Sequence, residues 1–161
     1  MVDVNIHKCF PTTIYEFNYE PTDKNLMESY IKQSRKNHSH TLDDLHRLSY
    51  FIKLKEKVYE VSKQYLNDLE YEYEKLEITG MWANVLYEGS AHAPHTHSNN
   101  FLSGVYYLST NKKSSPIQFF DPRAQANVLR PRNKPNWDNA SMVQFPAIQN
   151  KGYIFPSWLQ H

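Results

Sequence analysis

The most informative part of the sequence is His92-Ala-Pro-His-Thr-His-Ser-Asn-Asn-Phe-Leu-Ser-Gly-Val-Tyr-Tyr-Leu108, in which three of the chain's eight histidines precede an apolar run. Side chains two residues apart in an extended strand point to the same face, so a strand here would put His95 and His97 side by side. Imidazole is a common ligand for zinc, copper, iron and nickel. Taken alone, the pair is weak support for a metal site, because a polar loop rich in histidine explains it better. His92 fits a solvated loop residue rather than a ligand.

Two further features favour a metal centre. Gly89 stands six positions before His95, which gives Gly-x5-His-x-His, and the sequence ends with the apolar segment Gly152-Tyr-Ile-Phe-Pro-Ser-Trp-Leu-Gln-His161. An early His-x-ligand pair and a late single histidine, each on a β-strand, are how a double-stranded β-helix builds a mononuclear metal centre. We therefore expect such a centre here.

Composition limits the class of protein. A chain of 161 residues fits one domain, which we divide into a strand with supporting helices (1–75) and a jelly-roll core (76–161). The 18 basic and 17 acidic residues nearly balance, so the charge predicts binding neither to nucleic acids nor to membrane surfaces. Cys9 is the only cysteine, which excludes an internal disulfide. With neither a membrane span nor a signal-peptide pattern, we expect a cytoplasmic protein.

The first half of the chain predicts helices beside one strand. Residues 14–19 alternate as in a strand, and Thr22 or Asp23 would cap a helix ending near Lys36. A polar connector with His38 and His40 follows, and these histidines are expected to be solvated. After a second cap at 41–44, apolar residues recur at helical spacing from Phe51 to Leu69.

The second half predicts antiparallel strands. They cover residues 78–87, 105–108 (apolar on both faces, as in an interior strand), 117–120, 142–145 and 152–155. Prolines make the region from Pro122 to Asn139 a long loop, and Trp158 is expected in the core. The fold class is therefore α+β, mainly β: a double-stranded β-helix, or jelly roll, with the N-terminal helices packed on one sheet.

Several sequence blocks together resemble a family of 2-oxoglutarate/Fe(II)-dependent oxygenases found in marine bacteria and their phages. The blocks keep the family's order and spacing over about half of the chain; they are Trp82-Ala-Asn-Val85, Gly89, Pro94-His-Thr-His97, Leu102-Ser-Gly-Val-Tyr-Tyr-Leu108, Phe120-Asp-Pro-Arg123 and Phe155-Pro-Ser-Trp-Leu-Gln-His161. The resemblance implies a jelly roll with Fe(II) at its open end and 2-oxoglutarate as the second cofactor.

The resemblance also implies a ligand set, with one departure. The wider superfamily uses His-x-Asp/Glu and a distant histidine. His95 matches the first ligand and His161 the last, while His97 stands where the carboxylate is usual. His97 is then a third imidazole, or water replaces it, or Asp121 supplies the carboxylate. For Asp121 we prefer a turn cap before Pro122.

The binding of 2-oxoglutarate is harder to assign. Family members place a basic residue on the strand beyond the last histidine, whereas this sequence stops at His161. We expect that strand to be missing and His161 to be frayed, in a chain either truncated from a functional product or inactive. Arg123 or Arg130 would be substitute anchors for the distal carboxylate, with Tyr107 as the hydroxyl donor.

The functional hypothesis is an oxygenase that hydroxylates an unidentified small molecule, nucleobase or side chain and converts 2-oxoglutarate to succinate. One alternative is a cupin-like metal-binding protein that does not use 2-oxoglutarate. The cupin motif continues with a glutamate, however, and Phe101 and Leu102 hold those places. The other alternative is a truncated, inactive β-sandwich module without a metal. A homodimer is compatible with every hypothesis.

Overall fold

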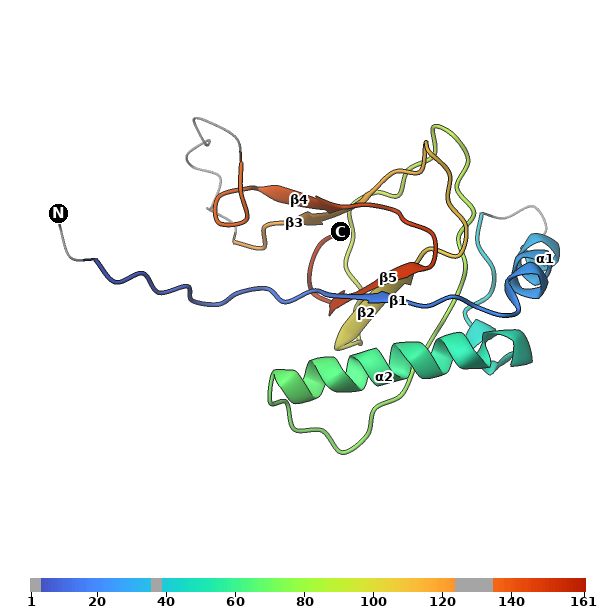
Figure 1. The fold of residues 1–161 in the computed structure, drawn as a ribbon, viewed down its shortest axis with the longest axis horizontal. Coiled ribbons are helices and arrows are strands. Elements are labelled where there is room, and N and C mark those ends of the chain that lie inside the picture. Colours follow the sequence, from blue (N-terminus) through green and yellow to red (C-terminus); the bar gives the residue numbers. More distant parts are fainter. Residues whose placement is uncertain (1–3, 36–38, 124–134) are drawn as a thin grey trace.

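The computed structural model describes residues 4–35, 39–123 and 135–161 (Figure 1). Within these residues, two α-helices and two short 3-10 turns precede four of the five strands, as the α+β prediction required. The helices are α1 (Lys24–Ser34) and α2 (Ile52–Asp68), and the 3-10 turns span Leu45–Arg47 and Ser49–Phe51. The strands are β1 (Tyr15–Asn18), β2 (Leu102–Tyr106), β3 (Ile117–Phe120), β4 (Met142–Phe145) and β5 (Lys151–Pro156).

The strands form two antiparallel sheets, one of three strands in the order β1-β5-β2 and one made of β3 and β4. The central strand of the larger sheet is β5, whose residues from Gly152 to Pro156 are all buried. This explains why that segment is apolar at consecutive positions. The prediction of an interior strand at 105–108 is wrong, because β2 lies at the edge of this sheet.

The three-stranded sheet is covered on both faces. Successive side chains of its central strand, β5, point to opposite faces and pack against different elements. Ile154 packs against Phe17 and against Val61, Tyr65 and Leu66 of α2. Its neighbours Tyr153 and Phe155 point to the opposite face, where they pack with Phe119 of β3 and with Leu159. Figure 1 shows α2 along one side of β1, β5 and β2, and the β3-β4 pair on the other. The prediction that the N-terminal helices pack on one sheet is confirmed for α2. The helix α1 packs instead, through Met27 and Ile31, against Leu45, Phe51 and Leu54.

The predicted strand at 78–87 is wrong. Among the described residues, this segment makes two isolated bridges, Met81 with Asp44 and Asn84 with His40. The backbone of this extended segment bonds to the connector 39–45 instead, for example from Val85 N to Ser39 O at 2.7 Å and from Met81 N to Asp43 O at 2.9 Å. A loop, rather than a strand, is its partner, so no regular ladder forms.

Of the remaining predictions about the fold, some are confirmed and others are wrong. The first helix begins after Asp23, as predicted, although its side chain makes no capping hydrogen bond. The second predicted cap leads only into the 3-10 turn at Leu45. Trp158 is exposed, and Leu159 fills the core position beside it. The double-stranded β-helix stays a prediction, since the described strands are only four to six residues long. In the described part of the chain, no helix has the length and apolar character needed to cross a membrane.

Candidate metal centre

Backbone pairing, rather than a regular strand, positions the histidine stretch. Residues 92–98 form no strand, contrary to the prediction. They run beside the segment that follows β5: His95 N donates to His161 O at 2.9 Å, and His161 N donates to His95 O at 3.1 Å. Further along, His97 N donates to Ser157 O at 3.0 Å. These three hydrogen bonds join the histidine stretch to residues 157–161.

This pairing brings three imidazoles together. Residues that exchange both backbone hydrogen bonds are direct antiparallel partners, and their side chains leave the same face. The ring centroids of His95 and His161 are 4.5 Å apart, those of His95 and His97 5.0 Å, and those of His97 and His161 5.2 Å. One potential ligand atom from each ring lies within 4.8 Å of the other two. Within the described ranges, no carboxylate or thiol belongs to this group.

Carbonyl partners orient two of the three rings. The Nδ1 atom of His95 lies 3.0 Å from the carbonyl oxygen of Ala93, and Nδ1 of His161 lies 2.9 Å from that of Leu159. A carbonyl only accepts, so in each ring Nδ1 carries the proton and donates it. The lone pair of Nε2 is then available, as in metal-binding histidines whose second nitrogen is held by an outer partner. The donor set therefore fits a divalent metal ion.

The surroundings of His161 hold it firmly. Its ring packs against Phe155 at 4.7 Å and against Phe119 at 6.2 Å between centroids. Phe120 N also donates to the carbonyl of the preceding residue, Gln160, at 3.0 Å. The expectation of a frayed His161 is wrong, because hydrogen bonds tie this segment both to the histidine stretch and to β3.

Burial and mutual repulsion favour neutral imidazoles. Burial lowers the pKa of His97, and the neighbouring His161 and His95 lower it further. Burial also lowers the pKa of His161, partly opposed by the hydrogen bond to Leu159 and assisted by His95. Charging one ring is costly beside two others in a half-buried site. The neutral form that binds metals is thus the form favoured at neutral pH.

Two aromatic neighbours complete this region. The indole of Trp82, half exposed, lies 5.8 Å from the ring of His97, and the exposed His92 lies 6.3 Å from His95. The role of Trp82 as a neighbour of His97 was not anticipated. The contacts of the buried Ser157 were not anticipated either. Its N–H donates to the carbonyl of Phe101, its carbonyl accepts from the N–H of His97, and its hydroxyl is hydrogen-bonded to that of Ser103. No spacing in the sequence marks either contact.

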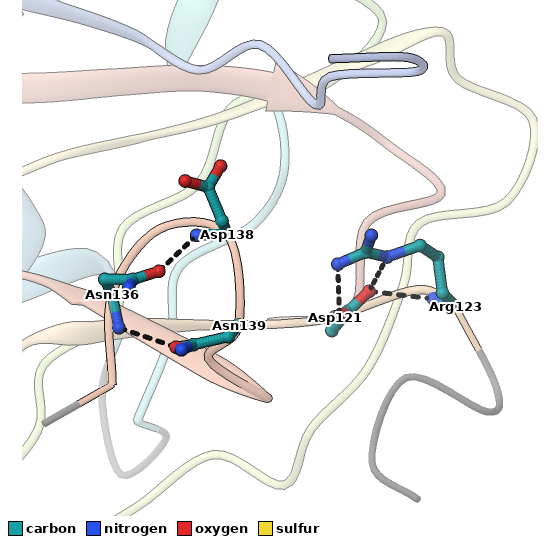
Figure 2. A network of polar contacts seen from close by, with 5 residues as sticks. All are labelled: Asp121, Arg123, Asn136, Asp138 and Asn139. Atoms are coloured by element: carbon teal, nitrogen blue, oxygen red, sulfur yellow. Dashed lines mark hydrogen bonds and ion pairs between the residues drawn. The ribbon is translucent and has the colours of Figure 1, made fainter. Parts of the chain in front are cut away.

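Asp121 and Arg123 form a pair of their own at the end of β3 (Figure 2). The Arg123 guanidinium donates to both carboxylate oxygens of Asp121, at 2.9 and 2.8 Å, and its backbone N–H donates to the same carboxylate at 3.0 Å. This backbone bond closes the turn across Pro122, the geometry expected of a turn cap. The Arg123 pairing lowers the pKa of Asp121, so the carboxylate is ionised at neutral pH.

Two further residues were predicted as candidates for binding 2-oxoglutarate. Tyr107 follows β2, its ring meets Tyr153 edge-on at 6.4 Å, and burial raises its pKa to about 12. Arg130 lies outside the described residues, as does His38. Figure 2 also shows the turn at 136–139, where Asn136 N donates to the Asn139 side chain at 2.8 Å.

Comparison with known proteins identifies the family of this chain. A search of curated proteins found no match for the chain. The sequence model of one protein family, described as "Putative 2OG-Fe(II) oxygenase", matches residues 80–161. The matched region contains all three clustered histidines, Trp82, and the strands β2 to β5. The chain therefore belongs to the putative 2OG-Fe(II) oxygenase family.

Proposed function

We propose that this protein is a 2-oxoglutarate/Fe(II)-dependent oxygenase that hydroxylates its substrate, with His95, His97 and His161 as the iron ligands. The observation that carries the proposal is the convergence of the three imidazoles, with ligand atoms within 4.8 Å, in a chain of this family. Bound iron would supply the activation of oxygen, coupled to the oxidative decarboxylation of 2-oxoglutarate to succinate.

The chain's own groups would do three things. The carbonyls of Ala93 and Leu159 hold two rings in the tautomer that exposes Nε2. The apolar rings of Phe155 and Phe119 limit water on the His161 side. His95 is exposed while the other two rings are half-buried, so the approach for cosubstrate and substrate is expected on the His95 side.

Arg123 and Tyr107 are our candidate anchors for 2-oxoglutarate. The Arg123 guanidinium is exposed but already bonded to Asp121, so it would have to exchange that carboxylate for the ligand's. Tyr107 stays protonated well above neutral pH and could donate a hydrogen bond. The substrate, expected to be a small molecule or a side chain, remains a prediction, as do the double-stranded β-helix, a homodimer and a cytoplasmic location.

The test is an anaerobic Fe(II) titration of the purified protein with and without 2-oxoglutarate. We expect about one iron per chain from the single histidine triad, and a weak visible charge-transfer band when 2-oxoglutarate chelates the iron. His95→Ala should abolish iron binding and the accompanying rise in melting temperature. The matched control is His92→Ala, which removes a nearby exposed imidazole outside the triad and should leave both unchanged.

The other outcomes separate the alternatives. Iron binding without any effect of 2-oxoglutarate would favour the cupin-like protein, which the all-imidazole donor set also suits. If the protein binds no iron, or binds it equally well with His95→Ala, the oxygenase assignment fails.

A further inference from the structure

The donor set of the candidate centre carries no charge of its own. His95 and His161 present Nε2 in the neutral tautomer, and the ring of His97 lies beside them, with centroids 5.0 and 5.2 Å away. A neutral imidazole that ligates through its lone pair adds nothing to the charge of the metal. Within the described ranges, the group that could hold an ion includes no Asp or Glu.

The acidic residue at the end of β3 is already paired with a cation. Asp121 is the acidic residue that follows β3, and its carboxylate is bonded to Arg123. Three neutral ligands would leave both formal positive charges on a divalent ion bound at the triad.

We propose that His97 determines how tightly the centre binds anionic co-ligands. With three neutral ligands the metal attracts an anion with its full double charge, whereas a carboxylate at position 97 would cancel half of it. Coulomb attraction across a few ångströms in a partly exposed site makes one unit of charge worth roughly tenfold or more in affinity. The inference rests on the proposed metal centre and concerns its preference for anions, the keto-carboxylate of 2-oxoglutarate among them.

The geometry leaves room for such a ligand. Three protein ligands leave coordination positions open on a divalent ion. One of the three ligand residues, His95, is exposed, so we expect an anion to approach the metal from that side. The Trp82 ring beside His97 contributes an aromatic wall without a formal charge. Replacing His97 with an acidic residue would therefore change the formal charge of the donor set by one unit.

The experiment compares a charge-matched pair of variants, His97→Asn and His97→Asp. The two side chains have nearly the same size and both offer an oxygen ligand, but only Asp is charged. Each protein is loaded with Co(II), which substitutes for Fe(II) and has visible absorption bands, and its metal content is measured. Azide is then titrated against those bands, followed by 2-oxoglutarate. His97→Gln and His97→Glu form a second pair, and His92→Ala is the unmodified-centre control.

We expect the parent protein, His97→Asn and His92→Ala to bind azide with similar affinity, and His97→Asp to bind it on the order of tenfold more weakly. The Gln and Glu variants should differ in the same direction. Equal azide affinity in the metal-loaded Asn and Asp variants would overturn this inference while leaving the proposed metal centre intact. If neither neutral variant holds Co(II), the parent protein and His97→Asp decide the question by the same criterion. Failure of the parent protein to bind Co(II) or Fe(II) would instead reject the proposed function, and this inference with it.

Discussion

Gly152 is a single position on which the packing of the larger sheet depends. It lies opposite Phe17 of β1 and Tyr106 of β2, and those two rings stack across it at 6.3 Å. A methyl group added at Gly152 would overlap the Phe17 ring, which is itself buried. We predict that Gly152→Ala lowers the free energy of unfolding by about 1–3 kcal/mol, as overpacking does in a close-packed core.

Gly80 provides the matched control for this substitution. A methyl group there would meet Asp43 at 3.7 Å, an ordinary van der Waals distance. Gly80→Ala should therefore change stability by only about 0.5 kcal/mol. Denaturant unfolding followed by circular dichroism measures both variants. Equal effects of the two substitutions would show that the ring stack is not what Gly152 accommodates.

The candidate site shows how far single residues can be predicted. His95, His97 and His161 were identified from spacing and resemblance, and they do converge. The reason given for the His95–His97 pair was wrong, since they lie on no strand. Pairing with residues 157–161 aligns them instead, and such a contact between distant segments leaves no local periodicity to read. The contacts of Ser157 and Trp82 were missed for the same reason.

At the level of elements, α2 contributes through one buried face. Leu66 is 4% exposed and packs with Phe17 and Ile154, whereas Leu69, at the end of the helix, is 38% exposed. We predict that Leu66→Ala costs about 2–5 kcal/mol of stability, because it removes methyl groups from a closed core and leaves a cavity.

Leu69→Ala removes the same atoms from a more exposed position of the same helix. Its cost should be about 1 kcal/mol or less, so thermal unfolding should separate the two variants clearly. If Leu69→Ala proved as destabilising as Leu66→Ala, helix formation rather than packing on the sheet would be the dominant effect.

Elements with a strong local pattern were predicted well. Alternation located β1, and helical spacing located α2 to within a residue at each end. Short apolar runs between turn residues located β3 and β4, whose observed bounds coincide with the prediction. The segment 78–87 has the same β-rich composition but pairs with a loop. Composition indicates an extended backbone, whereas a strand also needs a strand as its partner.

At the scale of the whole molecule, the layers explain how the site is assembled. The helix α2 covers one face of the sheet β1-β5-β2, and β3 and β4 cover the other (Figure 1). The chain leaving β5 bonds through Gln160 to β3 and through His161 to the histidine stretch. The three imidazoles are therefore held by hydrogen bonds that do not need a metal, and we expect a largely preformed site.

Buried tyrosines tie these layers together and make the fold sensitive to alkali. Burial raises the pKa of Tyr65, Tyr107 and Tyr153 to about 12; the hydroxyls of Tyr65 and Tyr153 donate to backbone carbonyls. A folded pKa above the unfolded value of about 10 means that the folded protein favours the neutral phenol. This stability is fully present below pH 10 and is lost as the pH rises towards 12. We therefore predict that part of the tyrosinate absorbance appears only together with the loss of circular dichroism. Complete ionisation of the tyrosines in a protein that keeps its full dichroism would contradict this account of the core.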